Sequence, residues 1–127
     1  MIDALFNQPN YLVAKRALDV TRLRQEAIAS NIANLETPNY RRVDVAPVFE
    51  AELQKAAAAG DAQRLREFRP RIAEDPSAVS GSKDGNTVTL EDELMRMSQN
   101  TLQNSLETQL VSGTLAKLRM AITGKPI

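Results

Sequence analysis

Apolar residues recur at helical spacing in two long stretches, one near each end of the chain. In the first stretch the steps alternate between four and three residues, which is the period of a coiled-coil seam. Its members are Ala14, Leu18, Thr21, Gln25, Ile28, Ile32 and Leu35. Pro9 suits the first turn of a helix, and Pro38 disfavours helical geometry in the residue before it. The pattern therefore predicts an N-terminal helix over residues 9–36.

The seam near the C-terminus follows the same alternation over a longer distance. Its members are Leu90, Leu94, Met97, Thr101, Asn104, Thr108, Val111, Leu115, Leu118 and Ile122. Acidic residues 91–93 begin the stretch and Lys117 and Arg119 lie near its end, which suits the helix dipole. Gly124 is a common type of helix stop. The pattern predicts a C-terminal helix over residues 89–123, about 50 Å long at ~1.5 Å per residue.

Each predicted helix also carries a second apolar stripe outside its seam. These stripes are Val13, Ala17, Val20 and Ala27 in the first helix, and Met95, Leu102, Leu106, Leu110 and Ala116 in the second. A hairpin that hides one seam from each helix would leave both stripes in water, which favours further association. Identical subunits related by a non-closing rotation form a helical filament. The alternative is a monomeric bundle in which the middle of the chain folds over the spare stripes.

We expect a single all-α domain, residues 1–127, in which the two long helices pack as an antiparallel coiled-coil hairpin. The helix-packing seam is predicted to consist of Leu18, Ile28, Ile32 and Leu35 with Leu94, Met97, Val111, Leu115, Leu118 and Ile122. The expected register places Leu18 opposite Leu115 and Gln25 opposite Thr108. Polar seam residues then meet one another near the centre, where they can fix the register.

Residues 37–88 are predicted to form a turn followed by an irregular middle segment. Residues 48–59 are compatible with a short helix, and Gly60 ends it. Residues 65–72 alternate apolar and charged side chains around Pro70, so any strand there is an edge strand. Because the middle segment has many charges and few large apolar residues, we expect it to be loosely ordered on its own.

Composition removes several classes of function. The chain has 16 basic and 16 acidic residues and a net charge of +0, whereas a nucleic-acid binder needs a basic excess or stripe. It has no cysteine and no histidine, which removes thiolate nucleophiles and the commonest general base and metal ligand. The acidic residues 91–93 lie where a helix start favours acids. We therefore expect no enzyme activity, no cofactor and no metal site.

Two short motifs flank the middle segment. The first runs from Ala29 to Tyr40 and reads A-S-N-I-A-N-L-E-T-P-N-Y. Its Pro38 and Asn39 suit the second and third positions of a tight turn, and its earlier asparagines can satisfy the last carbonyls of the helix or bind a partner. The second motif, D-G-N-T-V, begins at Asp84 and opens the C-terminal helix.

Together these motifs resemble those of the rod and hook family of bacterial flagellar axial proteins, A-S-N-I-A-N-x-x-T-P-G-Y and D-G-N-x-V-x-x-x-x-E. The chain departs from the pattern at Asn39, where the family usually has glycine, and Asn is the next best residue for a left-handed backbone. The length and residues 112–122 resemble the proximal-rod branch. The resemblance implies an assembly and turn motif formed by Asn31, Asn34, Thr37, Pro38, Asn39, Tyr40, Asp84, Gly85 and Asn86.

The resemblance implies a structural subunit of the proximal rod of the flagellar basal body, an organelle of motility. Such a subunit assembles helically with copies of itself and other rod proteins into a drive shaft and export channel. Further implied partners are ring-junction and export-gate proteins at the rod base. The implied location is the periplasmic rod, reached through the flagellar type III system without a cleaved signal.

The residues alone would indicate a cytoplasmic protein, and the resemblance overrides that interpretation. Residues 1–10 show no pattern of a cleaved secretory signal, and no apolar run approaches the ~18 residues of a membrane span. The competing hypothesis is a soluble coiled-coil adaptor or secretion chaperone, which also combines amphipathic helices with no catalytic residues. An adaptor has no reason to carry both motifs at opposite ends of one chain, so the pairing of the motifs favours the rod subunit.

Overall fold

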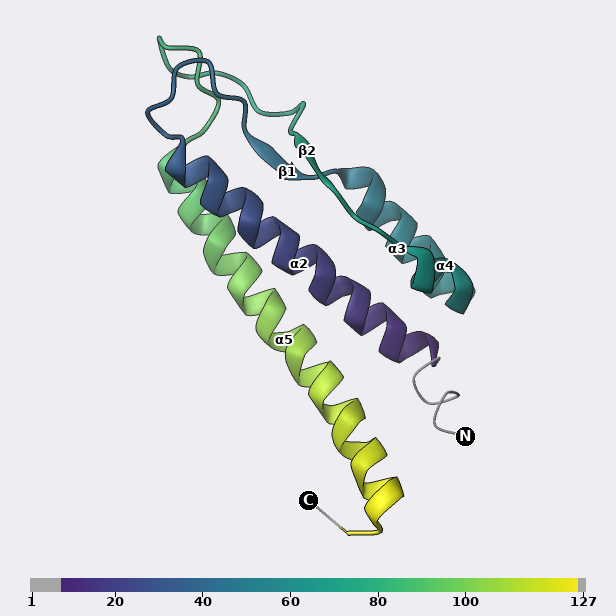
Figure 1. The fold of residues 1–127 in the computed structure, drawn as a ribbon. Coiled ribbons are helices and arrows are strands. Elements are labelled where there is room, and N and C mark those ends of the chain that lie inside the picture. The colour runs from purple at the N-terminus through teal and green to yellow at the C-terminus, as the bar shows by residue number, and fades with distance from the viewer. Residues whose placement is uncertain (1–7, 126–127) are drawn as a thin grey trace.

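A computed structural model describes residues 8–125 and consists mainly of helices. The long helices α2 (Pro9–Ala33) and α5 (Leu90–Thr123) lie side by side, as Figure 1 shows. Between them in sequence come β1 (Val43–Val45), α3 (Pro47–Ala59), α4 (Ala62–Glu67) and β2 (Ile72–Glu74). The expected helical fold class is therefore confirmed, and a small two-stranded sheet accompanies it. Within the described residues, no helix has an apolar stretch that would span a bilayer.

Helix α2 ends earlier than the sequence predicts, at Ala33 rather than Glu36. The backbone N–H of Asn34 still reaches the carbonyls of Ser30 and Asn31, while the Asn34 side-chain amide donates to the Ser30 carbonyl at 2.8 Å. Asn side chains compete in this way with the backbone bonds that would extend a helix. The chain then turns through residues 34–39, where Asn39 has a left-handed φ of 60°.

The middle segment is ordered in the structure, which differs from the loose segment expected. Strands β1 and β2 pair antiparallel, with Val43 opposite Glu74. The short helix α4 includes residues 65–67, the beginning of the stretch expected as an edge strand. The Asp61 carboxylate caps this helix by accepting from the Arg64 N–H at 3.0 Å. A strand follows only at Ile72–Glu74.

Two small clusters hold this segment to the side of α2 that faces away from α5 (Figure 1). Their buried members are Leu12, Ala56 and Leu65 in one cluster and Val20, Val45 and Phe68 in the other. The rings of Phe49 and Phe68 meet edge to face, with centroids 6.2 Å apart. The middle segment thus covers the second apolar stripe of α2, as the monomeric-bundle alternative predicted for that helix.

Polar side chains join α2 to α5, and their contacts run in opposite directions along the two sequences. Asn31 bonds to Glu93, Gln25 bonds to Asn100, and Thr21 bonds to both Asn104 and Glu107. The predicted register is therefore wrong, because Gln25 meets Asn100 and not Thr108. The shift of eight residues along α5 corresponds to about two helical turns. The centre of the interface is polar, but Asn100 and Glu107 contribute to it in place of the expected Thr101 and Thr108, which are exposed.

A different face of α5 is turned inward from the one expected. The residues that α5 buries are Glu93, Asn100 and Glu107, whereas Leu94, Leu115 and Ile122 are 44%, 41% and 63% exposed. Met97, Val111 and Leu118 are half-buried, and on the α2 side Ile28 is buried while Leu18, Ile32 and Leu35 are half-buried. The polar side chains enter the interface because α2 and β1 supply hydrogen-bond partners for them.

As a consequence, large apolar side chains of α5 point away from the rest of the chain. We define the outer stripe as Met95, Leu102, Leu106 and Leu110, whose exposed fractions are 55%, 65%, 55% and 63%. Unlike the second stripe of α2, this one is not covered by any element of the described chain.

The register predicts a specific crosslink. In a chain that has no cysteine of its own, cysteines at Gln25 and Asn100 should be joined in high final yield by a short thiol-reactive crosslinker, because these side chains touch at 3.1 Å. A Gln25→Cys/Thr108→Cys variant is the matched control, since Thr108 lies about two turns away. A higher final yield for the control pair, measured by electrophoresis, would contradict the observed register.

Candidate functional site

The two sequence motifs meet at one end of the molecule, where α2 ends and α5 begins. The Asn39 N–H donates to the Asp84 carbonyl at 2.9 Å, and the Thr87 N–H donates to the Tyr40 carbonyl at 3.1 Å. Residues some 45 positions apart in sequence are thereby held as two crossing turns (Figure 1). All nine predicted motif residues, from Asn31 to Asn86, lie in or beside this junction.

Asn86 closes the open end of α2. Its side-chain nitrogen donates to the carbonyls of Asn34, Leu35 and Thr37 at 2.9, 3.1 and 2.8 Å. These carbonyls follow the last turn of the helix, where intrahelical partners run out. The Asn34 and Thr37 carbonyls each accept one turn bond as well, from the N–H groups of Thr37 and Tyr40 at 3.1 and 3.3 Å. The Asn86 side-chain oxygen accepts from the Val88 N–H at 2.8 Å, and the residue is buried. The second motif is therefore a cap for the helix that carries the first.

Gly85 is required by the closeness of the two turns. It has a left-handed φ of 78°, and a Cβ at this position would lie 2.5 Å from the Asn39 side-chain oxygen. Asn39 itself adopts a left-handed φ, which Asn tolerates better than most residues. Any larger residue at position 85 would have to displace the Asn39 side chain and would also be strained by the left-handed backbone.

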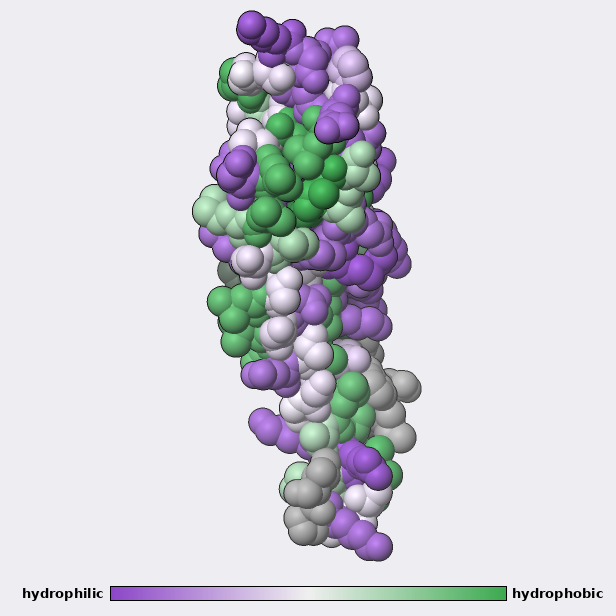
Figure 2. All heavy atoms as spheres, turned by 90° about the vertical axis from the view of Figure 1, so that its left-hand side faces the viewer, coloured by the Kyte–Doolittle hydropathy of each residue, from purple (hydrophilic) through white to green (hydrophobic). Residues whose placement is uncertain are grey.

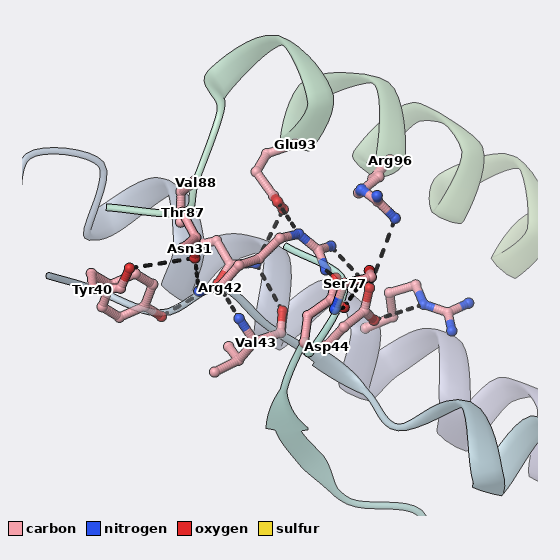
Figure 3. A network of polar contacts seen from close by, with 12 residues as sticks. Asn31, Tyr40, Arg42, Val43, Asp44, Ser77, Thr87, Val88, Glu93 and Arg96 are labelled. Carbon is pink, nitrogen blue, oxygen red and sulfur yellow. Dashed lines mark hydrogen bonds and ion pairs between the residues drawn. The ribbon is translucent and has the colours of Figure 1, made fainter. Parts of the chain in front are cut away.

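Asn31 connects α2 to both neighbouring segments from a fully buried position (Figure 3). Its side-chain oxygen accepts from the Val43 N–H at 2.9 Å and from the Tyr40 hydroxyl at 3.3 Å. Its nitrogen donates to the Val43 carbonyl at 2.9 Å and to the Glu93 carboxylate at 3.2 Å. The full hydrogen-bonding capacity of one amide thus fixes β1 and α5 to the end of α2.

Arg42 is the centre of the junction, and sequence reasoning missed it. The residue is 5% exposed, and its guanidinium donates to three carboxylates (Figure 3). Nε reaches Glu93 at 2.6 Å, Nη1 reaches Asp75 at 2.6 Å, and Nη2 reaches Asp44 at 2.9 Å. Its backbone N–H also donates to the Thr87 hydroxyl at 2.7 Å. One side chain therefore ties α5, the end of β2 and β1 together.

An outer pair of arginines extends this network. Arg24 of α2 bonds to Asp44 at 3.1 Å and also to Glu50, the acid in the first turn of α3. Arg96 of α5 lies 4.0 Å from Asp44. The carboxylate of Asp44 is therefore shared by arginines from three segments, so α2, β1 and α5 are coupled through one group.

The network shifts the pKa of three of its members, of which Asp75 and Arg42 lie at its centre. Burial alone would raise the pKa of Asp75 and lower that of Arg42. Hydrogen bonds from Ser77 and Arg42 outweigh burial and hold the pKa of Asp75 below its ordinary value. Bonds to Asp44 and Glu93 likewise raise the pKa of Arg42. Both groups are thus held in their charged forms.

One signal in the sequence could have predicted that Glu93 lies on the inward face of α5. Glu93, Asn100 and Glu107 recur every seven residues, so they share one face of α5 and form a polar seam. Glu93 was instead interpreted as one of three acids at a helix start. No comparable local signal marks Arg42, since its three acidic partners come from three different segments.

The junction has the chemistry of a structural joint. Its groups are amides, carboxylates and guanidiniums that already satisfy one another. Among the described residues there is no cluster of His, Cys, Asp and Glu that could hold a metal ion. A cleft of about 330 Å³ beside it is lined mainly by charged and amide side chains, including Arg24, Glu50 and Gln103. Neither place offers an activated nucleophile.

The cap formed by Asn86 gives a stability prediction. Asn86→Asp keeps the shape but puts an acceptor opposite three carbonyls, and we expect the free energy of unfolding to fall by about 2–4 kcal/mol. Gln109→Glu makes the same chemical change at an exposed position of α5. This control should change the free energy of unfolding by less than about 0.5 kcal/mol. Urea unfolding followed by circular dichroism measures both, and equal effects would contradict the capping role.

Acid should weaken the junction at Asp75. A carboxylate whose folded pKa is depressed stabilises fully above its unfolded pKa of ~3.9 and loses that contribution as pH falls through the folded pKa. We expect the free energy of unfolding to decline below about pH 4. The decline should be shallower in Asp75→Asn, when urea unfolding is repeated across this range. Identical pH profiles for the two proteins would show that Asp75 makes no such contribution.

Comparisons with known proteins agree on one family. The family described as Flagella basal body rod protein matches residues 12–41, which cover most of α2 and the first motif. A flagellar basal body rod protein FlgB from Cereibacter sphaeroides is 35% identical over 122 residues, covering 89% of this chain and 93% of the relative.

Two further relatives bear the same name. FlgB from Borrelia hermsii is 36% identical over 115 residues, covering 77% of this chain and 84% of its own. FlgB from Escherichia coli K12 is 31% identical over 122 residues, covering 80% of this chain and 83% of the relative. The resemblance of the two motifs is therefore confirmed across most of the chain, and nothing favours the adaptor or chaperone alternative. The chain belongs to the FlgB family of flagellar basal body rod proteins, which is a family of structural proteins and not of enzymes.

Proposed function

We propose that this rod subunit belongs to the proximal rod and packs there as an antiparallel coiled-coil hairpin of α2 and α5. Copies of the hairpin assemble helically with other rod proteins to form the drive shaft and the export channel. The observation that carries the proposal is the orientation of α5, which buries Glu93, Asn100 and Glu107 and leaves its leucines outside. A monomeric helix pair would gain more from the reverse orientation, because burying a Leu side chain stabilises by roughly 1.5–3 kcal/mol.

Neighbouring subunits supply the apolar cover that the chain itself lacks. The outer stripe contacts them along one side of α5, and the exposed seam residues Leu94, Leu115 and Ile122 offer a second contact on another side of the helix. Contiguous exposed apolar surface of this kind marks interaction sites in soluble proteins. The partners are other rod proteins, ring-junction and export-gate proteins at the rod base, and further copies of the chain.

The motif junction acts in assembly by fixing where the chain leaves and re-enters the hairpin. The residues proposed for this role are Asn31, Asn34, Thr37, Pro38, Asn39, Tyr40, Asp84, Gly85 and Asn86. Because Asn86 caps α2 and Asn31 binds Glu93 of α5, the junction sets the relative position of both helices. The contact surfaces on α2 and α5 keep a constant alignment only if the relative position of the two helices is fixed. The subunit reaches the periplasmic rod through the flagellar type III system without a cleaved signal.

Removing the outer stripe tests the proposal. In cells that lack the native subunit, Leu102→Ser/Leu106→Ser should abolish motility and the recovery of the subunit with basal bodies. The purified variant should keep its helical circular dichroism, since neither side chain is buried in the chain. Val79→Ser is the control, because Val79 is 85% exposed on the middle segment. Normal motility of the double variant would contradict the proposal that the outer stripe is a packing surface.

A further inference from the structure

The outer stripe of α5 lies in a stretch of helix that is almost free of charge. Between Arg96 and Lys117 the single charged residue is Glu107, which is 93% buried against α2 because only 7% of it is exposed. The exposed remainder is Leu, Ser, Thr, Gln and Gly, although charged residues make up 25% of the whole chain. In Figure 2, green hydrophobic patches run along the face of the molecule on which α5 lies, with pale surface between them. Depletion of charge around exposed apolar side chains is the composition of an interface core.

The stripe is also symmetric about its middle residue. Leu102 and Leu110 lie four residues before and after Leu106, on the same side of the helix. Two α5 helices that run in opposite directions and cross at Leu106 would pair each Leu102 with the Leu110 of the other copy. Gly113 lies two turns beyond Leu106 on this side, and a Cβ there would meet nothing within 4 Å in the chain. A glycine inside a helix costs stability, and its small size permits close approach of a neighbouring helix.

Charges at the two ends of α5 select the same direction. The helix begins with the exposed acids Glu91 and Asp92 and ends with the exposed bases Lys117 and Arg119. In an antiparallel pair the acidic start of one helix lies beside the basic end of the other, at both ends at once. A parallel pair would place like charges together, which disfavours that partner.

We infer that in the free chain the outer stripe is covered by a second copy, through an antiparallel pair of α5 helices related by a two-fold axis at Leu106. This contact is isologous and closes after two copies. A single helix pair is small beside the roughly 1,200–2,000 Å² of stable interfaces, so the dimer dissociates readily. If the outer stripe also binds rod neighbours, which rests on the proposed function, the dimer must open before a subunit enters the rod.

Cysteine crosslinking tests the two-fold axis directly, because the chain has no cysteine. Under mild oxidation Leu106→Cys should form disulfide dimers at least tenfold faster than Val79→Cys, whose residue is more exposed but lies on the middle segment. Leu102→Cys and Leu110→Cys should crosslink when mixed and only slowly when alone. Lys117→Glu/Arg119→Glu placed in the Leu106→Cys chain should slow its crosslinking.

Three outcomes would overturn the inference. Equal rates for Leu106→Cys and Val79→Cys would show that no specific pair forms. Rapid crosslinking of Leu102→Cys alone and Leu110→Cys alone would indicate parallel packing. Species larger than a dimer in sedimentation of the full chain would show that the contact does not close. None of these results bears on membership of the rod, which the motility of the Leu102→Ser/Leu106→Ser variant tests separately.

The link to assembly has its own test. Purified Leu106→Cys dimers, locked by the disulfide, should fail to join basal bodies in a reconstituted binding assay, and reduction should restore joining. Joining by the locked dimer would show that the outer stripe does not have to be free. That result would contradict the claim that the dimer must open before assembly, but not the inference that the dimer forms.

Discussion

The buried contact between Arg42 and Glu93 is the constraint on which the rest of the structure depends. Glu93 is fully buried and Arg42 nearly so, and removing one partner of such a pair costs about 3–5 kcal/mol, because a charge is left buried without compensation. Glu93 can meet Arg42 and Asn31 only if its side of α5 faces α2. Asn100 and Glu107 lie on that same side, so the first turn of α5 determines the orientation of the whole helix.

This orientation explains how one chain can be ordered and still leave a large apolar surface uncovered. The middle segment covers the second apolar stripe of α2 and gives the chain a small core around Leu12, Val20, Leu65 and Phe68. Nothing in the described chain covers the outer stripe of α5, whose side chains are more than half exposed. The polar junction therefore stabilises a monomer while directing apolar surface outward, as a subunit of an assembly requires.

Local signals in the sequence were sufficient for some features and not for others. Seam periodicity and the prolines predicted both long helices, because these depend on neighbouring residues. The residues of the two motifs lie at the junction. The inward face of α5 was not predictable in the same way. Met97, Val111 and Leu118 belong both to the predicted seam and to the face of α5 that is observed inward. Whether Leu94 or Glu93 joins them against α2 depends on Arg42, which is distant in sequence. Helix α4 was missed because its cap, Asp61, directly follows Gly60, the residue that ends the preceding helix.

The central claim is that α5 turns its polar face inward because Arg42 holds Glu93. Thiol labelling of single cysteines at Asn100 and Leu102 measures this directly in dilute, monomeric protein, since these residues are 3% and 65% exposed. We predict that the cysteine at position 102 reacts at least tenfold faster than the one at position 100, and that Arg42→Met brings the two rates together. Equal rates in the otherwise unchanged chain, or a difference that survives Arg42→Met, would contradict the account.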